Sequence, residues 1–206
     1  MIEQLIPFLI ASILLTLSPG PDIIYVLSQS LVAGYKKGMI IALGLVSGII
    51  IHTSLVAFGV SVVIKNSESL FWSIKMAGAL YLLYLAYKVY SSPTQPFDQE
   101  KVTNTARKSL FSDFKTGFIM NILNPKVTIF FLAFFPGFLW DTEKDLMIQF
   151  YILGGLFMLQ AFVIFSLVAL LSGQLSKLLF KTSKSYSFLK WFQIITFIAI
   201  ALLILV

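Results

Sequence analysis

Two short polar runs interrupt apolar segments of this chain, and their residues are the ones best suited to bind or carry a charged group. The first run is Leu17, Ser18, Pro19, Gly20, Pro21 and Asp22, and the second is Asn124, Pro125 and Lys126. A proline inside a helix costs about 3 kcal/mol, yet proline suits the first position of a helix, and Ser or Asn suits the cap before it. Ser18-Pro19 and Asn124-Pro125 are therefore predicted to cap and open two new half-helices.

Charged side chains lie in both runs, where they meet the ends of the predicted half-helices. A helix N-terminus attracts a carboxylate, so the two breaks are predicted to bind one. Asp22, the only acidic residue inside an apolar segment, would bind a substrate ammonium group or carry a coupling proton, unless it is an ordinary first-turn aspartate. Lys126 opposes the helix dipole, so it needs a partner such as Asp22 or a substrate carboxylate, or else its long stem reaches the membrane surface.

Two further residues are candidates for the same site. His52, the single histidine of the chain, follows Gly44 and Gly48 at intervals of four. This glycine spacing lets another backbone approach closely, either within one subunit or between two subunits of a homo-oligomer. His52 is then expected to face protein, as a packing residue or as a proton carrier. Asn121 shares a helix face with Asn124, and it either lines the same cavity or binds a neighbouring helix.

The composition indicates that lipid surrounds much of the chain. Of the 206 residues, 58% are hydrophobic and 12% are charged, whereas soluble domains average about 45–50% and about 25%. The net charge of +6 comes from residues between the apolar segments, which favours a role in membrane orientation over nucleic-acid binding. The absence of cysteine from the sequence excludes disulfides and thiolate metal sites, and no cofactor is expected.

Six segments are long and apolar enough to span a membrane, which takes about 20 residues each. The chain is therefore predicted to be an all-α polytopic membrane protein, with its first and fourth helices broken in mid-membrane. No signal peptide is expected. The predicted spans are residues 5–34, 38–64, 69–87, 117–140, 146–176 and 185–206.

A long polar stretch divides the predicted transmembrane domain, residues 1–206, into two halves. Residues 91–115 are expected to connect a first three-helix half, residues 1–90, to a second, residues 116–206. Because each half has an odd number of spans, the halves should insert in opposite orientations as an inverted repeat. The breaks open corresponding spans, and at about 1.5 Å per residue they reach nearly the same depth. Two half-helix N-termini are therefore predicted to meet inside the membrane.

Basic residues are unevenly distributed among the connections. Eleven Lys and Arg residues fall in the first, third and fifth connections, and two fall in the second and fourth. Because cytoplasmic connections carry an excess of Lys and Arg, the loop at residues 91–115 is predicted to be cytoplasmic and both termini to lie outside.

The two polar runs, with an aromatic stretch and Pro136-Gly137 after the second, resemble the motifs of the lysine exporter family of bacterial amino-acid translocators. That family includes homoserine and threonine resistance exporters. The similarity covers nearly the whole chain, with both motifs in order. It implies an inverted-repeat transporter that exports amino acids or close derivatives across the bacterial inner (plasma) membrane by proton antiport. Ser18, Pro19, Gly20, Pro21 and Asp22 match the first motif and Asn124, Pro125 and Lys126 the second, whereas His52 matches neither.

The alternative function is export of a divalent metal or other cation, as in a related superfamily. Such sites need several carboxylate or imidazole ligands, and the predicted spans offer one Asp and one His. An enzyme is not expected, because the spans contain no metal-binding HExxH motif, no paired aspartates and no serine–histidine arrangement. The expected partners are an amino acid, protons and membrane lipid.

Overall fold

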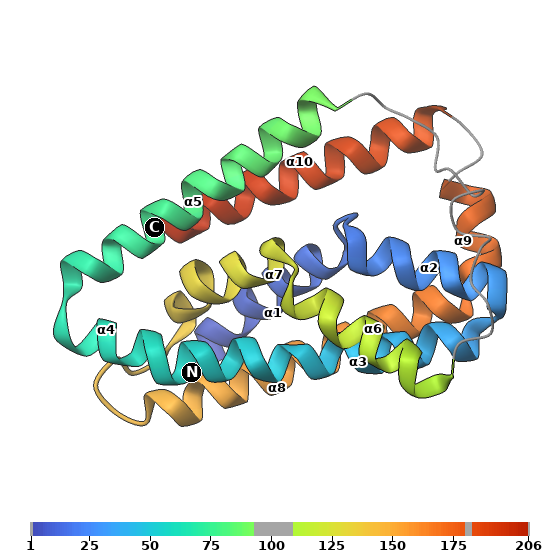
Figure 1. Cartoon of the computed structure of the whole chain (residues 1–206). Coiled ribbons are helices and arrows are strands. Elements are labelled where there is room, and N and C mark those ends of the chain that lie inside the picture. The colour runs from blue at the N-terminus through green and yellow to red at the C-terminus, as the bar shows by residue number, and fades with distance from the viewer. Residues whose placement is uncertain (1, 93–108, 180–182, 206) are drawn as a thin grey trace.

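The chain is helical through nearly all the residues that the computed structural model describes, which are 2–92, 109–179 and 183–205 (Figure 1). No β-strand occurs among those residues. Two elements are π-helical (η1 and η3) and one is a 3-10 helix (η4). In chain order the elements are α1 (Ile2–Leu17), α2 (Pro21–Ala33), α3 (Tyr35–Leu55), η1 (Val56–Val60), α4 (Ser61–Asn66), α5 (Glu68–Ser91), α6 (Leu110–Ile122), α7 (Pro125–Ile129), η3 (Phe130–Phe134), η4 (Phe135–Phe138), α8 (Leu146–Leu170), α9 (Ser172–Leu179) and α10 (Ser183–Leu205).

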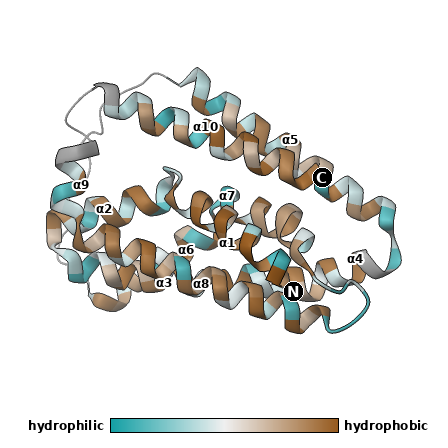
Figure 2. Cartoon of the chain, turned by 180° about the vertical axis from the view of Figure 1, so that it is seen from behind, coloured by the Kyte–Doolittle hydropathy of each residue, from teal (hydrophilic) through white to brown (hydrophobic). Residues whose placement is uncertain are grey.

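The described residues contain up to six membrane spans. Four helices are long and apolar enough by themselves, namely Tyr35–Val63, Glu68–Ser91, Leu146–Leu170 and Ser185–Leu205. Two bent pairs qualify when joined: α1 with α2, at 54°, and α6 with the helix Pro125–Phe138, at 48°. Figure 2 shows that hydrophilic residues lie mostly at helix ends and in connections. The prediction of an all-α polytopic membrane protein with broken first and fourth helices is confirmed.

Corresponding elements of the two halves run in opposite directions (Figure 1). The pair α1 and α2 runs from the end where the N-terminus lies toward the end where α9 lies, and α6 and α7 run back. The long helices α3 and α8 are antiparallel to each other, and so are α5 and α10, which lie side by side. This is the arrangement that an inverted repeat requires.

Two boundaries differ from the predicted ones. The first helix of the second half, α6, begins at Leu110, inside the predicted loop, because the Ser109 hydroxyl caps it by accepting a hydrogen bond from the Ser112 amide at 3.2 Å. The fifth predicted span ends at Leu170 instead of residue 176, and α9 follows as a separate short helix. Most of the predicted loop, residues 93–108, lies outside the described residues.

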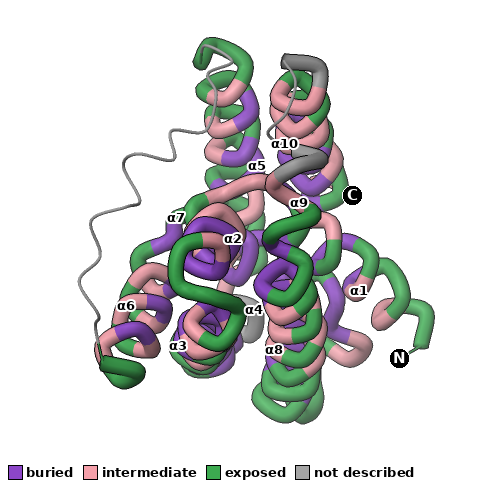
Figure 3. Tube along the Cα trace, turned by 90° about the vertical axis from the view of Figure 1, so that its right-hand side faces the viewer, coloured by how far each residue is buried: buried purple, intermediate pink, exposed green. Residues whose placement is uncertain are grey.

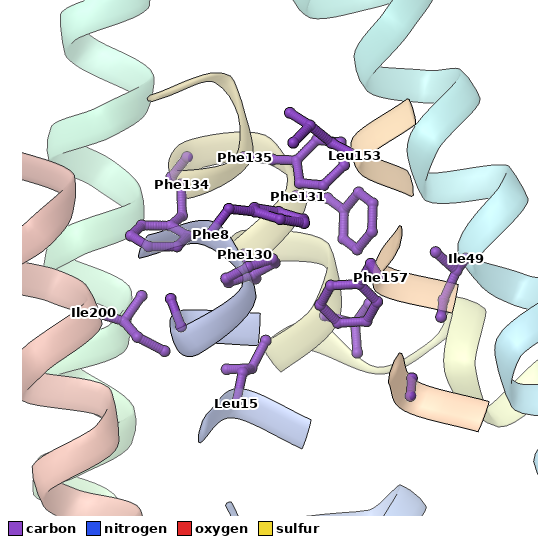
Figure 4. Close-up of a cluster of buried hydrophobic side chains, with 14 of the residues drawn as sticks. Phe8, Leu15, Ile49, Phe130, Phe131, Phe134, Phe135, Leu153, Phe157 and Ile200 are labelled. Carbon is purple, nitrogen blue, oxygen red and sulfur yellow. The ribbon is translucent and has the colours of Figure 1, made fainter. Parts of the chain in front are cut away.

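A cluster of phenylalanine rings holds the second broken helix in place (Figure 4). The ring of Phe131 lies against that of Phe135 at an interplanar angle of 32°, with centroids 4.4 Å apart. Phe8 of α1 meets Phe135 edge to face at 5.4 Å, and Phe157 of α8 meets Phe130 at 5.4 Å. Each such contact contributes about 0.5–1.5 kcal/mol beyond the burial of area. The cluster therefore fixes η3 and η4 against α1 and α8.

The contact between α3 and α6 is close because glycines face it from both helices. A Cβ on Gly44 would overlap the main chain of α6, and a Cβ on Gly117 would overlap the carbonyl oxygen of Ile41. Gly48 faces the side chain of Asn121 in the same way. The spacing of Gly44 and Gly48 thus serves packing within one chain, and it holds α6 against α3 as α6 approaches the second break.

The helices α5 and α10 form an outer pair beside the other helices (Figure 3). Among the four uninterrupted spans, α5 is the least buried. It approaches the rest of the molecule through Gly78, where an added Cβ would overlap the side chain of Ala133 in η3. Large apolar side chains of the pair, such as Leu80 and Leu202, remain exposed. Such a surface suits contact with lipid.

The connection between η4 and α8 is held by one buried glutamine. The Gln149 carbonyl accepts hydrogen bonds from the amides of Trp140 and Asp141, and its NH₂ group donates to the carbonyls of Asp141 and Lys144 at 2.7 Å each. The amides of Glu143 and Lys144 donate to the Asp141 carboxylate and lower its pKa. This connection is therefore a fixed turn at the end of the bundle opposite α9 (Figure 1).

Candidate substrate site at the two helix breaks

The first break separates α1 from α2 at Ser18, Pro19 and Gly20. The amide of Ser18 donates to the Leu14 carbonyl at 2.9 Å, so Ser18 still belongs to the end of α1. Gly20 is extended and precedes Pro21, which takes the first position of α2. The prediction that Ser18 caps the new helix and Pro19 opens it is therefore wrong by two residues. Both prolines suit a first position, but a residue before a proline avoids helical conformation, so α2 starts at the second proline.

The second break separates α6 from α7 and has the predicted form. The Asn124 side chain caps α7 by accepting a hydrogen bond from the Lys126 amide at 3.0 Å, and Pro125 occupies the first helical position. Asn124 is buried. The half-helix predicted from Asn124-Pro125 is confirmed, and it continues through η3 and η4.

Lys126 connects the two breaks. Its Nζ donates a hydrogen bond to the carbonyl oxygen of Ser18 at 2.8 Å and lies 5.9 Å from the ring centroid of Phe197 on α10. The Ser18 carbonyl lies at the C-terminal end of α1, where main-chain oxygens lack helical partners and carry partial negative charge. Lys126 is 9% exposed, so it binds the first break instead of reaching the membrane surface.

His52 supports the second break from outside the cavity. Its Nε2 lies 3.2 Å from the carbonyl oxygen of Asn121, near the end of α6, and its ring packs against Phe131. Since a carbonyl can only accept, Nε2 carries the proton in this contact. The prediction that His52 faces protein is confirmed, and His52 does not line the cavity described next.

A small cavity lies where the breaks meet. Its volume is about 30 Å³, which is enough for one or two water molecules, since each needs about 10–15 Å³ of cavity volume. The polar lining residues are Thr16, Ser18, Asp22, Asn121, Asn124 and Lys126. The remaining lining residues are Leu15, Gly20, Ile23, Ile49, Val127, Phe157, Ala161 and Phe165. Among the candidates from the sequence, the structure thus brings Ser18, Gly20, Asp22, Asn121, Asn124 and Lys126 to one cavity and leaves Pro19, Pro21, Pro125 and His52 outside its lining.

Three oxygen atoms around this cavity lack hydrogen-bond partners among the described residues: Ser18 Oγ, Asp22 Oδ1 and Asn121 Oδ1. The Asn124 and Asn121 amides and the Lys126 ammonium approach the Asp22 carboxylate, but Oδ1 receives no hydrogen bond of ordinary geometry. Burying an unpaired acceptor costs about 1–3 kcal/mol. Three such groups in one cavity form a place for a ligand that donates hydrogen bonds.

One buried carboxylate, that of Asp113, was not predicted from the sequence. Asp113 is 2% exposed on α6, and its Oδ1 lies 3.7 Å from Nζ of Lys37 near the start of α3. The prediction that Asp22 is the only acidic residue in a span is therefore wrong, because α6 begins earlier than expected and includes Asp113. The signal was present in the spacing of Asp113, Gly117 and Asn121 at intervals of four, which puts them on one helix face.

A helix of the second half also contributes to the cavity without any polar signal. The side chains of Phe157, Ala161 and Phe165 on α8 line it, although the sequence of α8 gave no reason to single them out. Among the described residues, no group of three or more His, Cys, Asp or Glu side chains is placed to hold a metal ion.

Comparison with known proteins identifies relatives and a family for this chain. Curated relatives include leucine efflux proteins of Salmonella choleraesuis, Salmonella paratyphi A and Salmonella typhimurium; each is 33% identical over 147 residues, which cover 71% of this chain and 68% of the relative. No solved structure matches the chain. The family model described as LysE type translocator matches residues 13–206. The chain therefore belongs to the family of LysE type translocators.

Proposed function

We propose that this protein exports neutral aliphatic amino acids, with L-leucine as a representative substrate, across the bacterial plasma membrane in exchange for protons. The observation that carries the proposal is the set of unpartnered oxygens of Ser18, Asp22 and Asn121 around one buried cavity. An amino acid's ammonium group has three N–H donors and one positive charge. These three acceptors, one of them a carboxylate, match it in number and in charge.

The other end of an amino acid also finds partners at the breaks. The first turn of α2 opens on the same cavity at Gly20, Asp22 and Ile23, and no described side chain caps that helix. Its free N–H groups and partial positive charge suit a carboxylate. Lys126, whose Nζ would lie 3.5 Å from a Cβ at Gly20, adds a full charge beside them. The two ends of the substrate thus meet groups of opposite sign.

The remaining lining is apolar, which favours an uncharged substrate side chain. Asp22 and Lys126 are the charged groups of the lining, and both are used by the two ends of the substrate. Within the described part of the chain, no further charged side chain lines the cavity to meet a basic or acidic substrate side chain. The names of the relatives, leucine efflux proteins, agree with this selectivity.

Coupling follows from the single carboxylate at the site. A protonated Asp22 carries no charge for the ammonium group, so proton binding and substrate binding exclude each other there. A proton that enters from outside would displace the substrate, and substrate from the cytoplasm would displace the proton. This competition is the minimal requirement for antiport.

The cavity has to widen during transport, because about 30 Å³ cannot hold an amino acid. The bent pairs at 54° and 48° offer the movable parts, since half-helices can tilt about a break while the main chain remains continuous.

The test is Asp22→Asn in purified protein reconstituted into vesicles loaded with L-leucine. The substitution keeps the shape of the side chain and removes its charge. We expect normal insertion. Under a pH gradient, leucine efflux should fall about 10- to 100-fold, because a hydrogen bond to a charged group is lost. The linked proton flux, followed with an entrapped pH dye, should fall in parallel.

The matched control is Glu143→Gln, which neutralises an exposed carboxylate far from the cavity and should leave both fluxes unchanged. Near wild-type leucine efflux by Asp22→Asn under a pH gradient would reduce Asp22 to a first-turn residue of α2 and overturn the coupling mechanism.

A further inference from the structure

We propose that Ala161, between Phe157 and Phe165 on α8, forms a notch that receives the substrate side chain and sets its permitted size. This inference rests on the function proposed above. It assigns selectivity to a helix that carries none of the charged or break-forming residues of the site.

The walls of the cavity differ in polarity. The polar lining groups come from the end of α1, from α2, and from α6 and α7 around the second break. Once the ammonium and carboxylate groups of a substrate occupy those sides, its side chain has to face a wall without polar groups. Among the described residues, two elements line the cavity without a polar group: α3 contributes Ile49 alone, and α8 contributes Phe157, Ala161 and Phe165, which is the larger wall.

The wall from α8 has a small residue between two large ones. Phe157, Ala161 and Phe165 recur at intervals of four, so they stack along one face of α8. All three are buried. A methyl group between two phenyl rings leaves a depression one side chain wide, because alanine is the smallest residue in the row.

The notch is rigid on the side of Phe157. The Phe157 ring lies 5.4 Å from that of Phe130 and 5.2 Å from that of Phe131, centroid to centroid, within the aromatic cluster (Figure 4). A ring held by two others cannot turn aside for a larger ligand without disturbing the cluster. Phe157 is thus a fixed boundary of the notch.

Hydrogen bonds between α8 and α1 hold the notch in place relative to the first break. Gln160, the residue before Ala161, donates hydrogen bonds to the Thr16 hydroxyl at 3.0 Å and to the Ser12 carbonyl at 3.5 Å. The Thr16 hydroxyl in turn donates to the Ser12 carbonyl at 2.8 Å. These bonds fasten α8 to α1 within the two turns before Ser18, so the distance from the head-group site to the notch is set by the fold.

Selectivity in such a notch is measurable because apolar sites discriminate by size. One methylene more or less in an apolar pocket changes specificity by about 10- to 200-fold. Ala161→Val adds two methyl groups to the notch and should exclude L-leucine while still admitting L-alanine. Phe165→Leu removes part of one wall and should shift preference toward larger substrates such as L-phenylalanine.

The experiment uses vesicles that contain the full-length protein and are loaded with equal amounts of L-alanine, L-leucine and L-phenylalanine. The released amino acids are quantified together under a pH gradient. We expect Ala161→Val to lower the leucine-to-alanine ratio by about 10-fold or more and Phe165→Leu to raise the phenylalanine-to-leucine ratio. Val163→Leu, a change of similar size on the exposed face of α8, is the matched control and should leave both ratios at their wild-type values.

Ratios are read within one vesicle preparation, so they do not depend on the yield of folded protein. Should Ala161→Val fail to insert, Ala161→Ser and Phe165→Leu test the same notch with smaller changes. Wild-type ratios in every notch variant that inserts would overturn this inference and leave the proposed function intact. Absence of amino-acid release by the wild-type protein would instead overturn the proposed function itself.

Discussion

At each break, the main-chain carbonyls that end a half-helix have lost their helical partners, and in lipid they cannot turn to water. A basic side chain from another part of the chain binds a carbonyl near the end of each half-helix, and at the second break this carbonyl also accepts a hydrogen bond from the Asn124 amide. Lys126 binds Ser18 at the first break, and His52 binds Asn121 at the second. This explains how a lysine is tolerated in the first turn of a helix and why the single histidine lies behind the cavity instead of in it.

The hydrogen bond of His52 predicts a difference between two substitutions. His52→Leu removes this donor, although the Asn121 carbonyl still accepts a hydrogen bond from the Asn124 amide at 3.0 Å, and should lower the free energy of unfolding by about 0.5–1.5 kcal/mol. His52→Gln offers an amide N–H at similar reach and should retain most of the stability. Thermal unfolding of the two variants in detergent measures the difference, and equal unfolding temperatures would mean that His52 only fills space.

The same His52→Gln variant decides the role that the sequence left open. Glutamine does not titrate, so a proton carrier at this position could not be replaced by it. Because His52 is outside the cavity lining, we expect near wild-type leucine export by this variant in vesicles. A variant that folds and does not export would assign the histidine to proton transfer.

The residue-level predictions from the sequence were right where the interaction is local. The Asn124 cap spans two residues and follows from the residue types alone. The partner of Lys126 could not be foreseen in the same way, because Ser18 is 108 residues away and is recognised through its main chain. Ser18 itself was misread as a cap, because two prolines competed for the start of α2 and local rules did not choose between them.

Among the elements, the close contact of α3 with α6 positions the second break. The glycines on both helices allow their backbones to touch, which is how helices associate where lipid removes the hydrophobic driving force. Asn121 and His52 face each other near this contact. The position of the second break therefore depends on glycines at the contact of α3 with α6, one or two helical turns before the break.

This contact predicts opposite effects for two glycine-to-alanine substitutions. A Cβ on Gly117 would overlap the Ile41 carbonyl, whereas a Cβ on Gly155 in α8 meets nothing within 4 Å. Gly117→Ala should destabilise the fold by about 1–3 kcal/mol through overpacking. Gly155→Ala should keep or raise stability, because alanine favours helix by about 1 kcal/mol. Thermal unfolding of both variants checks the signs, and a Gly117→Ala variant as stable as Gly155→Ala would show that the contact is loose.

Composition was sufficient to predict the existence of the elements, since each span needs only length and apolarity. Their ends and neighbours required more. The polar residues at the start of α6 resemble a loop in composition, but Ser109 makes them the first turn of a helix. The contribution of α8 to the cavity could not be predicted, because an apolar span has no polar stripe to show which face points inward.

At the scale of the whole molecule, the opposite course of the two halves sets which connections share an end. The C-terminal end of α5 lies toward the end where α9 lies, whereas the connections that precede α5 and α8 lie at the opposite end (Figure 1). Eleven of the basic residues belong to the first, third and fifth connections. The uneven distribution of basic residues along the sequence therefore follows the same alternation as the described helices, which run between the two ends of the fold.

Orientation in the membrane is the last prediction, and export depends on it, because the direction of transport is defined by which end faces the cytoplasm. The sequence has no cysteine, so single thiols can be placed at exposed positions: Ser91→Cys and Leu110→Cys at one end, Asn66→Cys and Thr142→Cys at the other. Because the end rich in Lys and Arg stays inside, an impermeant thiol reagent added to intact cells should label the second pair and spare the first. All four should react after the cells are permeabilised, which controls for thiol exposure. Labelling of Ser91→Cys and Leu110→Cys alone in intact cells would show that the orientation is the reverse of the one predicted. The start of α1 would then lie in the cytoplasm, and substrate and protons would reach the breaks from the sides opposite to those proposed.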